Sequence, residues 1–189
     1  MMQDDRLALF LLLGQSAERA VSKEPATAPS EPILLGPTYD IARSLPEDAK
    51  RASRAAMAYR LFFIFENYLR ELIVEVLSKA AGQGNWWDLV AIDVQNEVGR
   101  LENTEEIKAW MALGSRDKSA LMTFPQLLRV IDSCWDRGFS DLLRDKALLT
   151  EGRLITHLRN TVAHMTDIPE EELDRIRQVM RDWFRVIAP

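Results

Sequence analysis

Both histidines of the chain lie in one short stretch, "GRLITHLRNTVAHM", residues 152–165. Its polar residues include His157, Arg159, Asn160 and His164. Histidine exchanges protons near neutral pH, and the guanidinium of arginine binds phosphate through a fixed fork of N–H donors. Cleavage of RNA by its own 2′-hydroxyl needs a base, an acid and a cation beside the phosphate. The stretch therefore carries the residue types that this reaction uses.

Hydrophobic spacing predicts that residues 152–165 form a helix with one apolar and one polar face. The apolar positions recur every three or four residues: Ile155, Leu158, Val162 and Met165. His157, Asn160 and His164 share the opposite face, and Arg159 lies at its edge. Two interpretations follow from this pattern: a catalytic face, or a solvated face on which Arg159 pairs with a neighbouring acid.

The segment "RNTVAH", residues 159–164, resembles the R-x-x-x-x-H signature of the HEPN superfamily (higher eukaryotes and prokaryotes nucleotide-binding domains). The likeness extends over roughly residues 46–187. It implies an α-helical bundle without cofactors. It also implies RNA as the partner and a homodimer, because many HEPN domains are metal-independent endoribonucleases in which the motif helices of two chains face each other.

The resemblance also implies roles for the motif residues. Arg159 would bind the scissile phosphate, His164 would act as base or acid, and Asn160 would orient the histidine or the ribose. His157 is outside the signature and is a candidate RNA-binding residue from its helical face alone. An unbroken helix would hold Arg159 and His164 about 140° apart. They can converge only if the helix ends or bends near His164, as the following "MTDIP" favours, or if a partner chain supplies one of them.

A glutamate lies on the apolar stripe of a second helix, the one predicted from Pro46 to about Ala81. Glu66 is spaced among Phe62, Leu69 and Ile73. A carboxylate in such a place is costly unless it is paired. Glu66 is therefore a candidate catalytic residue as a partner of Arg159 or a histidine, or it makes a simple ion pair with Arg70 one turn on. Arg60, nearby, is a candidate RNA-binding residue.

The sequence predicts an all-α fold, because helical periodicity is present and β-alternation, repeats and glycine-rich phosphate loops are not. We expect a helical bundle of the HEPN type with a long spine helix and an additional N-terminal helix. The expected parts are an N-terminal helix (1–22), a proline-rich linker (23–45) and the HEPN-like bundle (46–189). Pro46 and Pro169 stand where helices begin, each followed by acidic residues.

Composition narrows the classes of function. The net charge of −5 argues against a broad cationic surface but allows a local basic pocket. The single cysteine, Cys134, rules out a disulfide framework within the chain and fits a reducing cytoplasm. The longest apolar run, residues 7–13, is too short to span a bilayer, so no membrane partner is expected. The two histidines lack carboxylates at the intervening positions that would complete a metal site.

The leading hypothesis is a metal-independent endoribonuclease that leaves a 2′,3′-cyclic phosphate. By the resemblance, such a domain would be a toxin or phage-defence effector, with an antitoxin or other partner protein. The alternative is a non-catalytic HEPN module for binding or dimerisation that serves a partner nuclease or nucleotidyltransferase. A third possibility is a bundle whose polar helix face has no chemistry.

Overall fold

A computed structural model describes residues 32–107 and 117–187, so the N-terminal helix expected over 1–22 lies outside the described residues. The chain divides into two compact units, 1–50 and 51–189. The proposed domain boundaries remain a prediction.

The described part of the first unit contains a short loop, a single helical turn and the start of the long helix that begins at Pro46. Leu34 and Asp40 form an isolated antiparallel bridge. The Asp40 carboxylate then caps helix α2 (Ile41–Ser44) by accepting a hydrogen bond from the Ala42 backbone N–H. Residues 41–44 of the predicted proline-rich linker therefore form a helical turn.

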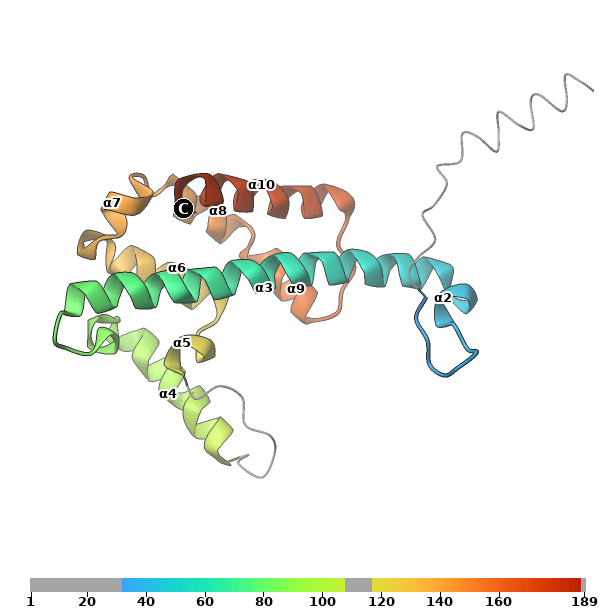
Figure 1. Ribbon diagram of the computed structural model, residues 1–189, viewed down its shortest axis with the longest axis horizontal. Helices are drawn as coiled ribbons and strands as arrows, with labels where there is room; N and C mark the ends of the chain where they lie inside the picture. Colours follow the sequence, from blue (N-terminus) through green and yellow to red (C-terminus); the bar gives the residue numbers. More distant parts are fainter. Residues whose placement is uncertain (1–31, 108–116, 188–189) are drawn as a thin grey trace, which may run out of the picture. The chain divides into compact units, whose positions relative to one another are not determined.

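The described residues are α-helical, with two 3₁₀ turns and no strand beyond that bridge, as predicted (Figure 1). The remaining elements in chain order are α3 (Pro46–Ala81), η1 (Trp86–Leu89), α4 (Ile92–Ile107), α5 (Lys118–Leu121), α6 (Phe124–Ser133), η2 (Trp135–Arg137), α7 (Phe139–Leu143), α8 (Ala147–Leu154), α9 (Thr156–Ala163) and α10 (Glu170–Ile187). None of the described helices has the length and apolarity that crossing a bilayer requires.

Helix α3 has the bounds that the sequence predicts, and from Arg51 on it is the spine of the second unit. Glu47 and Asp48 in its first turn complement the positive end of the helix dipole. The helix ends where Gly82 adopts a left-handed conformation with φ of 60°, which suits a residue without a Cβ. The residues that α3 buries are mostly apolar: Ala58, Phe62, Phe65, Leu69, Ile73, Val76 and Leu77.

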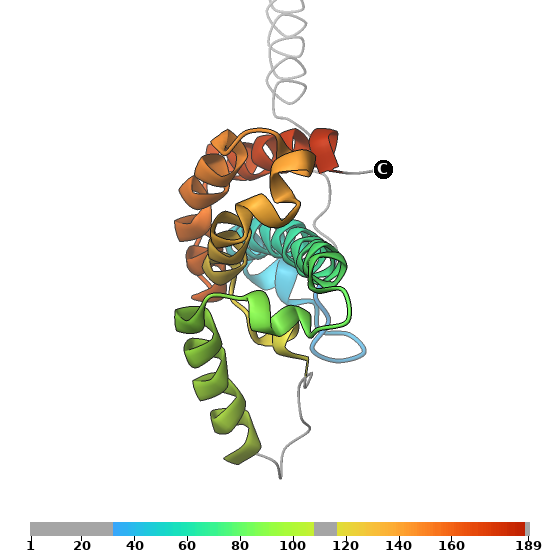
Figure 2. The same ribbon diagram turned by 90° about the vertical axis from the view of Figure 1, so that its left-hand side faces the viewer.

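Aromatic side chains join α3 to α6 and α10. Phe65 contacts Trp183 of α10 and Phe124 of α6, with ring centroids 5.4 and 5.6 Å apart. The indole of Trp183 also donates a hydrogen bond to the Leu148 carbonyl of α8 at 3.0 Å, which satisfies its buried N–H. Figure 2, which looks along α3, shows α6 and α10 packed against it. These contacts fix the scaffold on which α9 is held.

The predicted single helix over 152–165 is wrong, because two helices divide the stretch. Helix α8 ends at Leu154, and α9 runs from Thr156 only to Ala163. The apolar residues before that end are buried as expected: Ile155, Leu158 and Val162. Met165, expected on the same face, is instead 90% exposed and has a φ of 57°, because the helix has already ended.

Candidate active site

Helix α9 ends immediately before the motif histidine. His164 is the C-cap residue, and its backbone N–H donates to the Asn160 carbonyl at 3.0 Å. Met165 follows in the left-handed region, which turns the chain away from the helix axis. The early end that the sequence favours is therefore present, and the His164 side chain is exposed to solvent.

Glu66 of α3 is a buried carboxylate that binds two arginines. Its Oε1 accepts a hydrogen bond from Nε of Arg159, and its Oε2 accepts one from Nη2 of Arg70, both at 2.8 Å. Only 7% of Glu66 is exposed, so these charged partners offset the cost of burying it. The two pairings that the sequence left open for Glu66 occur together, and the three groups carry one net positive charge.

Arg70 is anchored more firmly than its ion pair alone would require. Its Nε donates to the Ser119 carbonyl at 3.1 Å and its Nη2 to the Met122 carbonyl at 3.0 Å. Its Nη1 donates to the Asn67 side-chain oxygen at 3.1 Å. Arg70 therefore ties α3 to α5 and holds one side of Glu66 in place. Sequence spacing indicated the pair with Glu66, but the carbonyl partners lie about fifty residues further along and gave no signal.

Arg159 lies on the wall of a cavity of about 300 Å³. The lining residues come from α3, α5 and α9: Tyr59, Phe62, Phe63, Glu66, Asn67, Arg70, Ala120, Arg159, Val162 and Ala163. The Arg159 side chain is 30% exposed. Glu66 accepts from Nε of Arg159, and no described residue accepts a hydrogen bond from either Nη group. The fork of the guanidinium is therefore available to a ligand.

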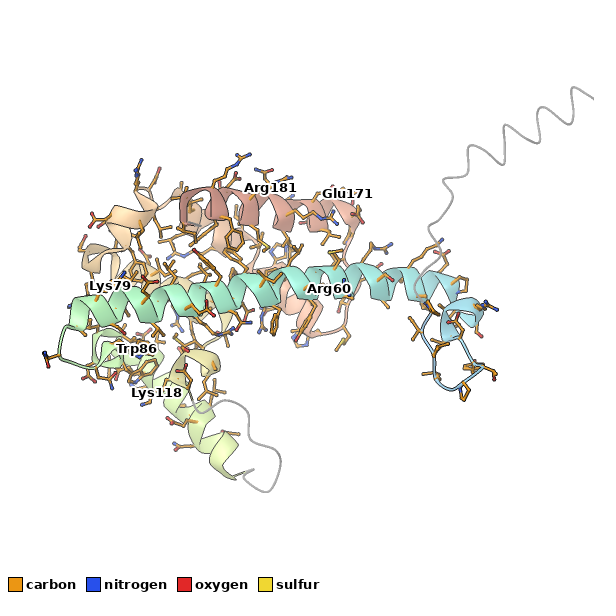
Figure 3. All side chains as sticks on the ribbon, viewed as in Figure 1. Arg60, Lys79, Trp86, Lys118, Glu171 and Arg181 are labelled. Atoms are coloured by element: carbon orange, nitrogen blue, oxygen red, sulfur yellow. The ribbon has the colours of Figure 1, made fainter. Side chains whose placement is uncertain are left out.

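The other candidate residues lie outside that cavity in the single chain. His157 and Asn160 are exposed on α9, and neither is part of the cavity wall. His164 is the residue after Ala163, which does line the cavity, but its own side chain does not. Arg60, labelled on α3 in Figure 3, is exposed and is also absent from the wall. One chain thus brings together Glu66 and Arg159 and leaves the remaining candidates at its surface.

A family model for Swt1-like HEPN domains matches residues 60–188, which include Glu66, Arg159 and His164. The chain belongs to the Swt1-like HEPN family. The resemblance noted in "RNTVAH" is thereby confirmed, and membership supports an RNase-type or nucleotide-binding module. No curated protein and no solved structure matches the chain.

A second contact of α3 fixes the turn after the motif of this HEPN domain. Arg54 donates through Nη2 to both carboxylate oxygens of Asp167, at 3.0 and 3.1 Å, and through Nε to the Ile168 carbonyl at 3.2 Å. Arg51 adds a longer ion pair to Asp167. The segment that follows His164 is therefore held on α3.

Among the described residues, the pKa values of four groups clearly shift, and none of these groups lines the cavity: Tyr68, Glu97, Asp132 and Arg177. Hydrogen bonds from Lys146 and Arg153 lower the pKa of Asp132, which ties α8 to α6. Hydrogen bonds from Arg129 and Gln126 lower the pKa of Glu97. These shifts report structural ion pairs. No group of three or more potential metal ligands lies together in the described part of the chain.

Proposed function

We propose that this HEPN domain is a metal-independent endoribonuclease in which Arg159 binds the scissile phosphate. The observation that carries the proposal is the contact of Glu66 with Nε of Arg159 at 2.8 Å, which leaves both Nη groups on the cavity wall. Arginine binds phosphate through paired N–H donors, and a guanidinium held in advance needs little reorganisation when the charge develops. The net positive charge of the Glu66, Arg70 and Arg159 group suits an anionic substrate.

His164 would move protons in this reaction. A base takes the proton of the 2′-hydroxyl, the 2′-oxygen attacks phosphorus, and the bond to the 5′-oxygen breaks as an acid protonates that oxygen. The products are a 2′,3′-cyclic phosphate and a 5′-hydroxyl. Asn160, one turn before His164, would orient the histidine or the ribose.

The active unit in this proposal is a homodimer. Base and acid must stand on opposite sides of the phosphate, and each chain offers one motif histidine. His164 is exposed at the end of α9 and does not line the cavity of its own chain. A two-fold dimer that places the α9 helices face to face would supply the second histidine.

The biological setting follows from the resemblance to HEPN ribonucleases. We place the protein in the cytoplasm, as a toxin or phage-defence effector whose activity an antitoxin or other partner protein restrains. The single cysteine, Cys134, is buried and is compatible with a reducing compartment.

The test is cleavage of labelled RNA in the presence of EDTA. We expect products with 2′,3′-cyclic ends, and a loss of about 10²- to 10⁴-fold in rate for both Arg159→Ala and His164→Ala. Arg175→Ala, an exposed arginine of α10, is the matched control and should retain the wild-type rate. Cleavage that EDTA abolishes, or that survives in His164→Ala, contradicts the mechanism.

Mixing the wild type with excess His164→Ala chains tests the shared site. If each site uses both histidines, the activity per wild-type chain should fall as mixed dimers form. A chain that remains a monomer while it cleaves RNA contradicts the dimer.

The position of His164 outside the cavity also favours the second candidate, a non-catalytic HEPN binding module. A folded wild-type protein that cleaves no RNA yet binds a partner nuclease or nucleotidyltransferase tightly would support that function instead.

A further inference from the structure

Two exposed aromatic rings stand at the mouth of the Arg159 cavity. Tyr59 and Phe63 lie one turn apart on α3 and are 59% and 57% exposed. Their ring centroids are 6.1 Å apart, and the ring planes are inclined by 30°. Both residues line the cavity whose wall includes Arg159. Neither ring makes an aromatic contact with another described element, so both present much of their surface to solvent.

We propose that Tyr59 and Phe63 form a stacking platform for a base of the RNA next to the phosphate held by Arg159. This inference rests on the proposed function and adds a subsite to it. Aromatic side chains stack on nucleic-acid bases with about 1–3 kcal/mol per base, and every base has a face that can stack. A nucleotide combines such a face with a negative charge, and the cavity combines two rings with a net positive charge.

The composition of the cavity favours a nucleotide over an apolar protein segment. Beside the rings the wall has an apolar part, made by Phe62, Ala120, Val162 and Ala163. Charged and amide groups interrupt it: Glu66, Asn67, Arg70 and Arg159. Its volume of about 300 Å³ is at the lower end for ligand sites, which fits a single nucleotide unit.

The hydrogen bonds within the wall predict the kind of base preference. The Asn67 side-chain oxygen already accepts from Arg70, and its amide donates to the Phe63 carbonyl at 2.8 Å. Both oxygens of Glu66 are likewise occupied by arginines. Few groups remain to read the edge of a base, so recognition by the platform depends on stacking. All four bases are accepted, and purines are favoured because their rings offer more area.

Binding of a short single-stranded RNA whose 2′-hydroxyls are methylated, so that it cannot be cleaved, tests the platform and is measured by fluorescence anisotropy. Tyr59→Leu and Phe63→Leu should each weaken binding roughly 5- to 150-fold, the equivalent of the stacking energy of one base. Phe63→Trp should retain or tighten binding, because it enlarges the ring. Ile64→Ala is the matched control: Ile64 is an exposed apolar residue of α3 outside the cavity, and its loss should leave the affinity unchanged.

A 2-aminopurine in the same methylated RNA, beside the position at which unmodified RNA would be cleaved, reports stacking directly. Its fluorescence should be quenched on binding to the wild type and not on binding to Phe63→Leu. If both leucine variants bind the RNA and quench the probe as the wild type does, the platform is refuted. The proposed nuclease survives that result if the wild type still cleaves RNA.

Light scattering on the same variants separates the platform from a contact between protein chains. If the leucine variants dissociate into monomers while each chain still quenches the probe, the rings belong to an interface between copies, and the platform is refuted. If these variants lose RNA binding and the wild type binds RNA without cleaving it, the platform is retained and only the nuclease is refuted.

Discussion

Replacing Glu66 by glutamine removes one charge and almost no volume, so it isolates the electrostatic role of this residue. The carboxylate accepts from both Arg70 and Arg159 at 2.8 Å through different oxygens. Glutamine offers a single carbonyl oxygen, and its amide is a donor. One guanidinium must therefore lose its acceptor and face another N–H group in a nearly buried place.

The solvent exposure of the two arginine side chains limits how much stability Glu66→Gln can remove. A hydrogen bond to a charged group contributes about 1.5–3 kcal/mol, and removing one partner of a fully buried ion pair costs about 3–5 kcal/mol. The side chains of Arg70 and Arg159 are 16% and 30% exposed, so water partly solvates the stranded charge. We expect Glu66→Gln to lower the free energy of unfolding by about 2–3 kcal/mol. Arg159→Ala should lower it by only about 1 kcal/mol, because Arg70 continues to neutralise Glu66.

Urea unfolding at pH 7, followed by circular dichroism, measures the free energy of unfolding of both variants. An unchanged slope of this free energy against urea concentration indicates that only stability has changed. Glu71→Gln, an exposed glutamate of the same helix, is the control and should stay within about 0.5 kcal/mol of the wild type. The reasoning is refuted if Glu66→Gln is equally neutral, or if Arg159→Ala proves the more destabilising of the two.

Two further predictions concern the helices that carry α9. Asp132→Asn should lower the free energy of unfolding by about 1 kcal/mol at pH 7, since Lys146 and Arg153 lose their shared acceptor. Because these partners lower the folded pKa of Asp132, the stabilisation is complete above the unfolded pKa of about 4 and fades as the pH falls through the folded value, so thermal melts should converge in acid. Gly152→Val should cost about 2–3 kcal/mol in urea unfolding, because a Cβ there would lie 3.1 and 3.2 Å from the two methyls of buried Leu128. A melt of Asp132→Asn that stays equally displaced however far the pH is lowered, or a Gly152→Val protein as stable as the wild type, would contradict these assignments.

The long helix and the all-α class could be predicted because local signals marked them. Pro46 with its acidic neighbours marks the start of α3, and Gly82 marks its end. The break at Ile155 could not be predicted in the same way. Ile155 is buried on either description, so hydrophobic spacing does not distinguish one helix from two.

Some contacts of the candidate site could likewise be predicted from the sequence, and others could not. The place of Glu66 on an apolar stripe indicated that a partner had to exist, and Arg159 was one of those proposed. The anchors of Arg70 and the contact between Arg54 and Asp167 join residues far apart in the chain. No periodicity records such pairs, because they depend on how the helices pack.

The motif residues are held by one element at two points. Arg159 is fixed to α3 through Glu66, and the turn that follows His164 is fixed to the same helix through Arg54. Those two positions on α3 are separated by roughly 18 Å of helix, since each residue adds about 1.5 Å. Helix α9 and the turn after it are therefore held at two positions along the same helix, α3. Because both anchors lie on α3, this helix fixes where α9 and the following turn lie, together with the packing of α9 against α6 and α8. This explains how so short a helix as α9 can present both groups in a fixed geometry.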